Sequence, residues 1–76
     1  MHTVQVNLNS VEKVRAFVNS VNTFNSEFDL VSGRFVIDAK SIMGILSLDL
    51  SKPIELTIHT EDHLDEVLDA IKSFLI

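Results

Sequence analysis

The sequence predicts an α+β open-faced β-sandwich, in which three helices cover one face of a four-stranded antiparallel sheet. Two observations lead to this expectation. Apolar residues recur with period two in four segments, and they recur with helical spacing in three others. In chain order these segments read β-α-β-β-α-β-α. A chain of 76 residues is expected to form a single domain over 1–76, and a domain of that size buries about 60% of the surface that its unfolded form exposes.

The first strand and the first helix are predicted between residues 2 and 22. In the strand HTVQVNL, polar residues alternate with Val4, Val6 and Leu8. Asn9 or Ser10 is expected to cap the helix, and Glu12 stands three residues after Asn9, which is the spacing of a capping box. The residues expected to form the buried stripe of this helix are Val11, Val14, Phe17, Val18 and Val21.

A β-hairpin is predicted over 26–38. The segments SEFDLV and RFVID are expected to form its two strands, with Phe28 and Leu30 pointing inward. The Ser32–Gly33 pair between the segments is typical of a tight turn.

The last strand and the last helix are predicted between residue 54 and the C-terminus. Pro53 blocks helix continuation, and IELTIHT then alternates as the fourth strand. Thr60 is expected to cap the helix, and the acidic Glu61 and Asp62 would lie near the positive end of its dipole. The apolar stripe expected for this helix is Leu64, Val67, Leu68, Ile71, Phe74 and Leu75.

The segment 40–48, KSIMGILSL, is predicted to form the short middle helix. Ser41 is well placed to cap it. Gly44 lowers helix propensity by about 1 kcal/mol relative to alanine. A packing or access requirement is therefore expected at Gly44.

The apolar side chains of this short helix leave two interpretations open, because they cannot all face one direction. Ile45 and Leu48, three residues apart, can be buried together. The residues that then point elsewhere are Ile42, Met43 and Leu46. Either this helix lies wholly in the core, or those three side chains form a partly exposed patch on which another protein docks.

Charge and composition exclude several classes of function. The net charge is −5, and the six Lys and Arg residues are scattered, so the positive patch that nucleic-acid binding requires is missing. The chain has no Trp or Tyr on which bases could stack. No apolar run approaches the roughly 18 residues of a membrane span, and no secretory signal is recognised. The absence of cysteine fits a cytoplasmic protein.

No catalytic or metal-binding constellation is evident. His59 and His63 are four residues apart, but a helix beginning after Thr60 would place them on different elements, so no metal site is expected. The acidic run EDHLDE is explained by a solvated helix start. No catalytic residues and no cofactor are therefore predicted.

The segment KSIMGILSL closely resembles the regulatory-serine segment of the histidine-containing phosphocarrier (HPr) family of the bacterial sugar phosphotransferase system. The predicted order of elements is also that family's order. The resemblance implies that Ser41 matches the serine that a dedicated kinase phosphorylates in family members from Gram-positive bacteria. It also implies partners for the apolar patch: Enzyme I, that kinase and a catabolite-control regulator.

A phosphate on Ser41 would lie at a helix N-terminus, where free N–H groups favour an anion. Lys40 is expected to favour this phosphate, and Asp38 is expected to oppose it.

The chain departs from the family at the phosphocarrier motif, which runs roughly Gly-X-His-Ala-Arg-Pro. Counting back without gaps from Ser41, the histidine position falls on Ser10 and the arginine position on Glu12, within LNSVEKV. A phosphohistidine needs an imidazole nitrogen, and Glu12 would repel a phosphate. Phosphocarrier activity at this position is therefore not expected.

The leading hypothesis is an HPr-like interaction or regulatory module that docks through Ile42, Met43 and Leu46 and is regulated at Ser41. The alternative is a phosphocarrier that transfers phosphoryl groups through another residue, such as His59 or His63. A third hypothesis is a domain that keeps only the scaffold, because fold does not fix function.

Overall fold

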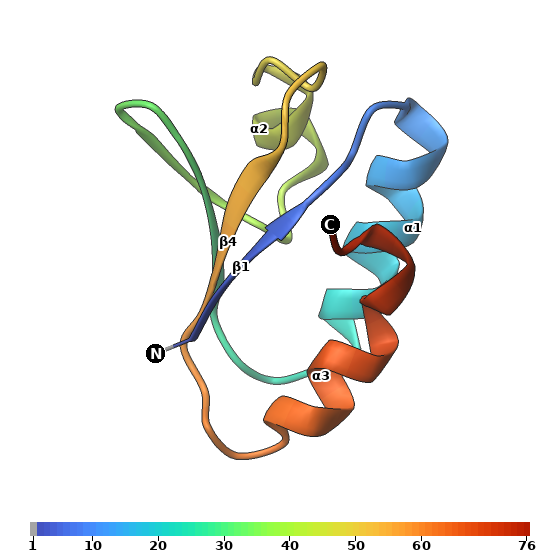
Figure 1. The fold of residues 1–76 in the computed structure, drawn as a ribbon, viewed down its shortest axis with the longest axis vertical. Coiled ribbons are helices and arrows are strands. Elements are labelled where there is room, and N and C mark those ends of the chain that lie inside the picture. Colours follow the sequence, from blue (N-terminus) through green and yellow to red (C-terminus); the bar gives the residue numbers. More distant parts are fainter. Residues whose placement is uncertain (1) are drawn as a thin grey trace.

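The computed structural model describes residues 2–76 and contains the predicted elements in the predicted order (Figure 1). The strands pair antiparallel in the spatial order β1-β4-β2-β3. In chain order the elements are β1 (His2–Val6), α1 (Val11–Asn22), β2 (Phe28–Ser32), β3 (Phe35–Asp38), α2 (Ile42–Leu46), β4 (Ile54–Ile58), α3 (Leu64–Ala70) and the 3₁₀-helix η1 (Lys72–Phe74). The predicted α+β open-faced sandwich is confirmed.

The register of the sheet gathers apolar side chains on one face. Leu56 of β4 lies opposite Val4 of β1 on one side and opposite Leu30 of β2 on the other. Because directly opposed residues of antiparallel strands share a face, alternate positions along all four strands point toward the helices. The other face carries mostly polar residues, and none of the helices within residues 2–76 covers it (Figure 1).

The three α-helices cover the apolar face, as the sequence predicts (Figure 1). Helix α1 contributes four buried side chains: Val14, Phe17, Val18 and Val21. The ring of Phe17 meets that of Phe74 edge to face at 5.5 Å between centroids, which joins α1 to the C-terminal segment. The Asn7 N–H donates to the Phe74 carbonyl at 2.8 Å, so β1 and the C-terminal segment are also joined through the backbone.

The start of α1 differs from one of the expectations. Ser10 is the capping residue, and its Oγ accepts the N–H of Lys13 at 3.1 Å. Asn9 therefore precedes the cap, and the predicted capping box between Asn9 and Glu12 does not form. Val11, the first helical residue, is 50% exposed and so lies outside the buried stripe.

The start of the last helix also differs from the prediction. Helix α3 begins at Leu64, and the residue before it, His63, adopts a left-handed conformation with φ of 64°. Thr60 does not cap the helix; its hydroxyl donates to the Asp62 carbonyl at 2.9 Å within the preceding turn. The acids of the first turn are those further along, Asp65 and Glu66. The residues that were expected to begin the helix form this turn instead, so the helix starts later in the chain.

The β2–β3 hairpin has a two-residue loop. Ser32 pairs with Phe35, and Gly33 between them has φ of 60°. A positive φ at the first of two loop residues is typical of a type II′ turn, whose twist matches that of the strands and which favours glycine at this position. The predicted turn is therefore confirmed one residue later than expected: its loop residues are Gly33 and Arg34, and Ser32 belongs to β2.

Gly44 is required by the close packing of α2 on β3. A Cβ at this position would lie 2.5 Å from Cγ2 of Ile37 and 3.2 Å from Oγ of Ser41. The expected packing requirement for the glycine is thus found in the contact between the α2 backbone and the side chain of Ile37.

We predict that Gly44→Ala destabilises the protein by about 1–2 kcal/mol, because the clash with Ile37 outweighs the gain in helix propensity. Urea denaturation measures the loss. Ile37→Leu removes the Cγ2 methyl, so the double variant Gly44→Ala/Ile37→Leu should lose less than the sum of the two single variants. Additive losses would show that this contact is not the reason for the glycine.

We predict that His63→Gly stabilises the protein by about 0.5–1 kcal/mol, because glycine has no steric penalty in the left-handed region. Thermal denaturation followed by circular dichroism measures the change. His63→Ala is the matched control: it removes the imidazole but keeps Cβ, and it should give no gain. Equal effects of the two variants would contradict the backbone explanation.

Candidate functional site

The exposed apolar side chains of α2 form the candidate site. Met43 is 80% exposed, Leu46 40% and Ile42 36%, whereas Ile45 is fully buried. We call Ile42, Met43 and Leu46 the α2 patch. The core-only interpretation of this helix is therefore wrong for these three residues, and Ile45 lies on the core side as predicted. Exposed Met and Ile side chains are adaptable contact groups.

Both ends of α2 are held by serine side chains. Ser41 Oγ accepts the N–H of Gly44 at 3.2 Å, so the predicted cap is confirmed. At the other end, the Ser47 hydroxyl donates to the Gly44 carbonyl at 2.6 Å. A helix of five residues has few internal hydrogen bonds. Its orientation, and that of the patch, therefore depends on these serines and on buried Ile45.

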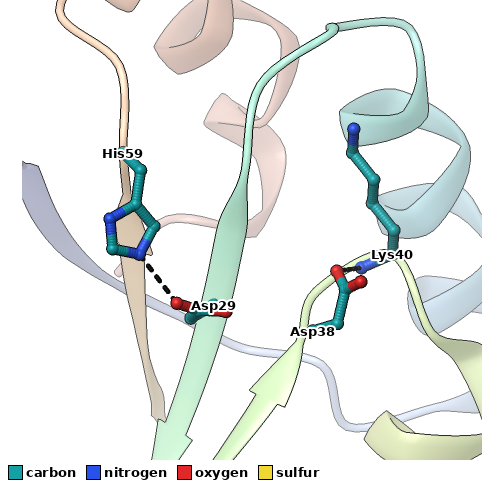
Figure 2. A network of polar contacts seen from close by, with 4 residues as sticks. All are labelled: Asp29, Asp38, Lys40 and His59. Atoms are coloured by element: carbon teal, nitrogen blue, oxygen red, sulfur yellow. Dashed lines mark hydrogen bonds and ion pairs between the residues drawn. The ribbon is translucent and has the colours of Figure 1, made fainter.

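The charged neighbours of Ser41 are arranged differently from the expectation. Lys40 Nζ donates to the Phe24 carbonyl at 2.9 Å and lies 5.6 Å from the centroid of the Phe28 ring. Figure 2 shows this side chain extending toward the segment before β2. The ammonium of Lys40 is thus engaged elsewhere and does not face Ser41. The carboxylate of Asp38 accepts the backbone N–H of Lys40 at 2.9 Å (Figure 2).

The loop after α2 is held by the carboxylate of Asp49. Its Oδ1 accepts the hydroxyl of Ser51 at 2.5 Å and the Ser51 N–H at 3.1 Å. These hydrogen bonds lower the pKa of Asp49 below its usual range, because they favour the charged form of the carboxyl. The loop is therefore tied down by a group that stays ionised at neutral pH.

The start of α1 carries Ser10 and Glu12, the residues that the sequence comparison above predicts to stand at the family's histidine and arginine positions. Ser10 and Glu12 are both exposed. The Oγ of Ser10 is used as the helix cap, and Glu12 lies in the first helical turn. Helices α1 and α2 pack against each other, so this position and the α2 patch belong to neighbouring elements. The chemistry available at Ser10 is that of a hydroxyl and not that of an imidazole.

The histidines considered as alternatives lie on separate elements. His59 follows β4, and its Nε2 is 2.7 Å from Oδ2 of Asp29 (Figure 2). His63 precedes α3, where its Nδ1 is 4.0 Å from Oε2 of Glu66. No group of three or more His, Asp or Glu side chains within residues 2–76 is arranged to hold a metal ion.

Sequence reasoning missed two exposed apolar residues next to the hairpin turn. Phe35 is 65% exposed and Val36 is 62% exposed, although both lie in a predicted strand. The alternation of RFVID predicts a strand but not its place at the edge of the sheet.

None of the helices within residues 2–76 has the length and hydropathy needed to cross a bilayer. The element order and the strand order define the class: an open-faced β-sandwich with its helices on one side. Residues 5–76 match the family model described as the PTS HPr component phosphorylation site. The chain therefore belongs to the HPr family of the phosphotransferase system.

Solved structures agree with this assignment. Phosphocarrier protein HPr from Bacillus anthracis is 28% identical, with a TM-score of 0.66 over 99% of this chain and 94% of that one. HPr-C-His from Thermoanaerobacter tengcongensis is 24% identical, with a TM-score of 0.78 over 96% and 89%. The histidine-containing phosphocarrier protein of a Mycoplasma is 14% identical, with a TM-score of 0.74 over 95% and 89%. The search of curated proteins gave no match.

We predict that Ser10→Ala destabilises the protein by about 1 kcal/mol, because it removes the acceptor for the Lys13 N–H. Asn9→Ala is the matched control and should change stability by less than about 0.5 kcal/mol. Urea denaturation of the two variants measures both values. A larger loss from Asn9→Ala than from Ser10→Ala would contradict the assignment of the cap.

Proposed function

We propose that this chain is an HPr-like interaction or regulatory protein of the cytoplasm, formed by a single domain over 1–76, that does not carry phosphohistidine at the family's usual site. The observation that supports the proposal is that Ser10 serves as the cap of α1. The ungapped count from Ser41 predicts that this same residue stands at the family's histidine position. Family membership supports a role connected with the phosphotransferase system.

The chemistry at Ser10 argues against rapid phosphoryl transfer. A serine phosphoester is far more stable than the phosphoramidate of a phosphohistidine, so it gives up its phosphoryl group slowly. Glu12, at the position matched to the family's arginine, would place a negative charge near the phosphate. Such like-charge repulsion raises the energy of the phosphorylated state.

The α2 patch supports a docking role. Its three exposed apolar side chains can be buried by a partner, while Ile45 anchors the helix from below. The partners that the family resemblance favours are Enzyme I-like, HPr kinase-like and catabolite regulator-like proteins. Neither nucleic acid nor a membrane is proposed as a partner.

Phosphorylation of Ser41 would regulate this patch through the helix start. The Ser41 Oγ is the acceptor for the Gly44 N–H, so a phosphoryl group on that oxygen acts directly on the N-terminus of α2. Because Lys40 is engaged by Phe24 and Phe28, the free N–H groups of α2 are the proposed stabilisers of the phosphate.

We predict that the unmodified chain gains no heat- and acid-labile phosphoryl group from Enzyme I and phosphoenolpyruvate. Ser10→His/Glu12→Arg supplies the missing imidazole and cation, and this variant should become labelled. Labelling with ³²P-phosphoenolpyruvate, followed by acid treatment, measures both. A labile label on the unmodified chain would overturn the proposed loss of carrier function.

We predict that an HPr kinase with ATP adds one acid-stable phosphoryl group to Ser41, and that Ser41→Ala abolishes it.

Met43→Asp should weaken binding to Enzyme I or the kinase by about tenfold or more, because it places a charge in the patch. The exposed-surface control Asn19→Asp lies on α1 and should bind normally. Intact-mass measurement and calorimetry provide the readouts. No modification at Ser41 and no binding to either protein would refute the regulatory proposal.

One observation favours the alternative, a carrier that uses another histidine. The contact of His59 Nε2 with Asp29 can hold that nitrogen protonated, which leaves Nδ1 as a nucleophile. His63 lacks so close a carboxylate, with Glu66 at 4.0 Å. In the labelling assay, a labile label that His59→Gln removes and His63→Gln keeps would support this alternative.

A further inference from the structure

The free edge of the sheet carries exposed apolar residues that have no role in the proposed function. Strand β3 is the last strand on its side, because the sheet order ends β2-β3. The β2–β3 hairpin projects away from α1 and α3 (Figure 1). An edge strand presents unpaired backbone groups, and proteins commonly protect such edges with charge or cover them with another element. Here the first two positions of the edge strand carry the exposed apolar residues Phe35 and Val36.

The pairing of β3 with β2 identifies the backbone groups that face outward. The Ala39 N–H donates to the Phe28 carbonyl at 2.8 Å, so these two residues form a hydrogen-bonded pair. Hydrogen-bonded and non-hydrogen-bonded pairs alternate along an antiparallel ladder. In the register of β2 and β3, Val36 and Asp38 therefore fall in non-hydrogen-bonded pairs. Their N–H groups point toward the free edge.

The charges at the two ends of this edge are complementary under a two-fold axis. Arg34 precedes β3 and Asp38 ends it, each two residues from Val36. If two β3 strands pair antiparallel with Val36 opposite Val36 of the second copy, Arg34 of each copy lies opposite Asp38 of the other. Phe35 then lies opposite Ile37 of the other copy, which covers the exposed ring. Shifting the register by two residues in one direction would instead place Arg34 opposite Lys40.

Asp38 also lacks a cationic partner within residues 2–76, although it has an acidic neighbour. It lies directly opposite Asp29 in the sheet, and like charges in that position repel. Asp29 has His59 beside it, whereas Asp38 accepts the backbone N–H of Lys40 through one oxygen (Figure 2). The Arg34 side chain forms no ion pair with another residue of the described chain. A second copy would supply each of these two side chains with its missing partner.

We propose that the chain forms a symmetric dimer through its β3 edges, which joins two four-stranded sheets into one continuous sheet centred on Val36. The occupant of the edge is a second copy of this chain, because the charge order Arg34 to Asp38 is complementary to itself when reversed. The interface is small, and the net charge of −5 on each copy opposes association. The dimer is therefore weak and forms at high protein concentration.

Sedimentation velocity at physiological salt, across ~10 μM to ~1 mM protein, tests the proposal in the range where small interfaces associate. The unmodified chain should shift from monomer to dimer. Arg34→Asp and Asp38→Arg should each weaken self-association at least tenfold, because each variant brings like charges together. An equimolar mixture of the two variants should restore the dimer, because the carboxylate introduced in one chain then meets the guanidinium introduced in the other. Circular dichroism checks that each variant is folded.

A backbone test separates the edge from other surfaces. Val36→Pro removes the outward N–H, a change that an edge strand tolerates, and it should abolish the dimer. Val36→Thr keeps the N–H and the branched side chain and should preserve the dimer. A monomer at every concentration would overturn the proposal. So would a dimer unaffected by the charge and proline variants, or a dimer lost on Met43→Asp, which would place the contact at the α2 patch.

Discussion

Strand β4 connects the two halves of the sheet, and the rest of the structure depends on its pairing. Among the described residues, β1 does not pair with the β2–β3 hairpin. β1 pairs with one side of β4, and β2 of the hairpin pairs with the other. The inward residues of β4, Ile54, Leu56 and Ile58, are at most 1% exposed. They form the surface on which the helices pack. Because β4 comes late in the chain, the sheet closes only through contacts between residues distant in sequence, which is costly in chain entropy.

The sequence-based predictions succeeded where one strong periodic signal decides the outcome. The alternation of Ile54, Leu56 and Ile58 and the stripe that includes Val14 and Phe17 were sufficient to predict the β4 strand and the α1 helix. The same patterns predicted one apolar face and hence the class of fold. Periodicity carries this information because it reports which side of an element is buried.

The predictions failed where local turn chemistry decides the outcome. Thr60 has the right side chain for a helix cap, but its hydroxyl donates to the Asp62 carbonyl within a turn, and His63 precedes the helix in a left-handed conformation. Nothing in the composition of EDHLDE indicates a histidine with positive φ. The exposure of Phe35 and Val36 was also missed, because the place of a strand in a sheet is set by tertiary pairing and not by its own pattern.

The candidate site was predicted in part. Ser41 was identified as the cap of α2, and the spacing correctly placed Ile45 on the core side. The spacing left open whether the other apolar side chains of α2 are buried, and the structure shows that the α2 patch is exposed. The direction of the Lys40 side chain was not predictable from the sequence. It depends on the position of the Phe24 carbonyl and the Phe28 ring, both well before Lys40 in the chain. A long flexible side chain can contact partners so distant in sequence only after the fold has placed those partners near it.

The Ser41 cap has a consequence for how α2 can respond to chemical change. The same oxygen that accepts the Gly44 N–H is the atom to which any modifying group would be attached. In many proteins a modified side chain and the structural support of a nearby surface are separate residues, so one can change while the other holds. In this chain a single atom would have both roles if Ser41 is modified as proposed. A covalent change at that oxygen would therefore alter its hydrogen bond to the α2 backbone directly. No other residue would lie between the modified atom and the helix that carries Met43.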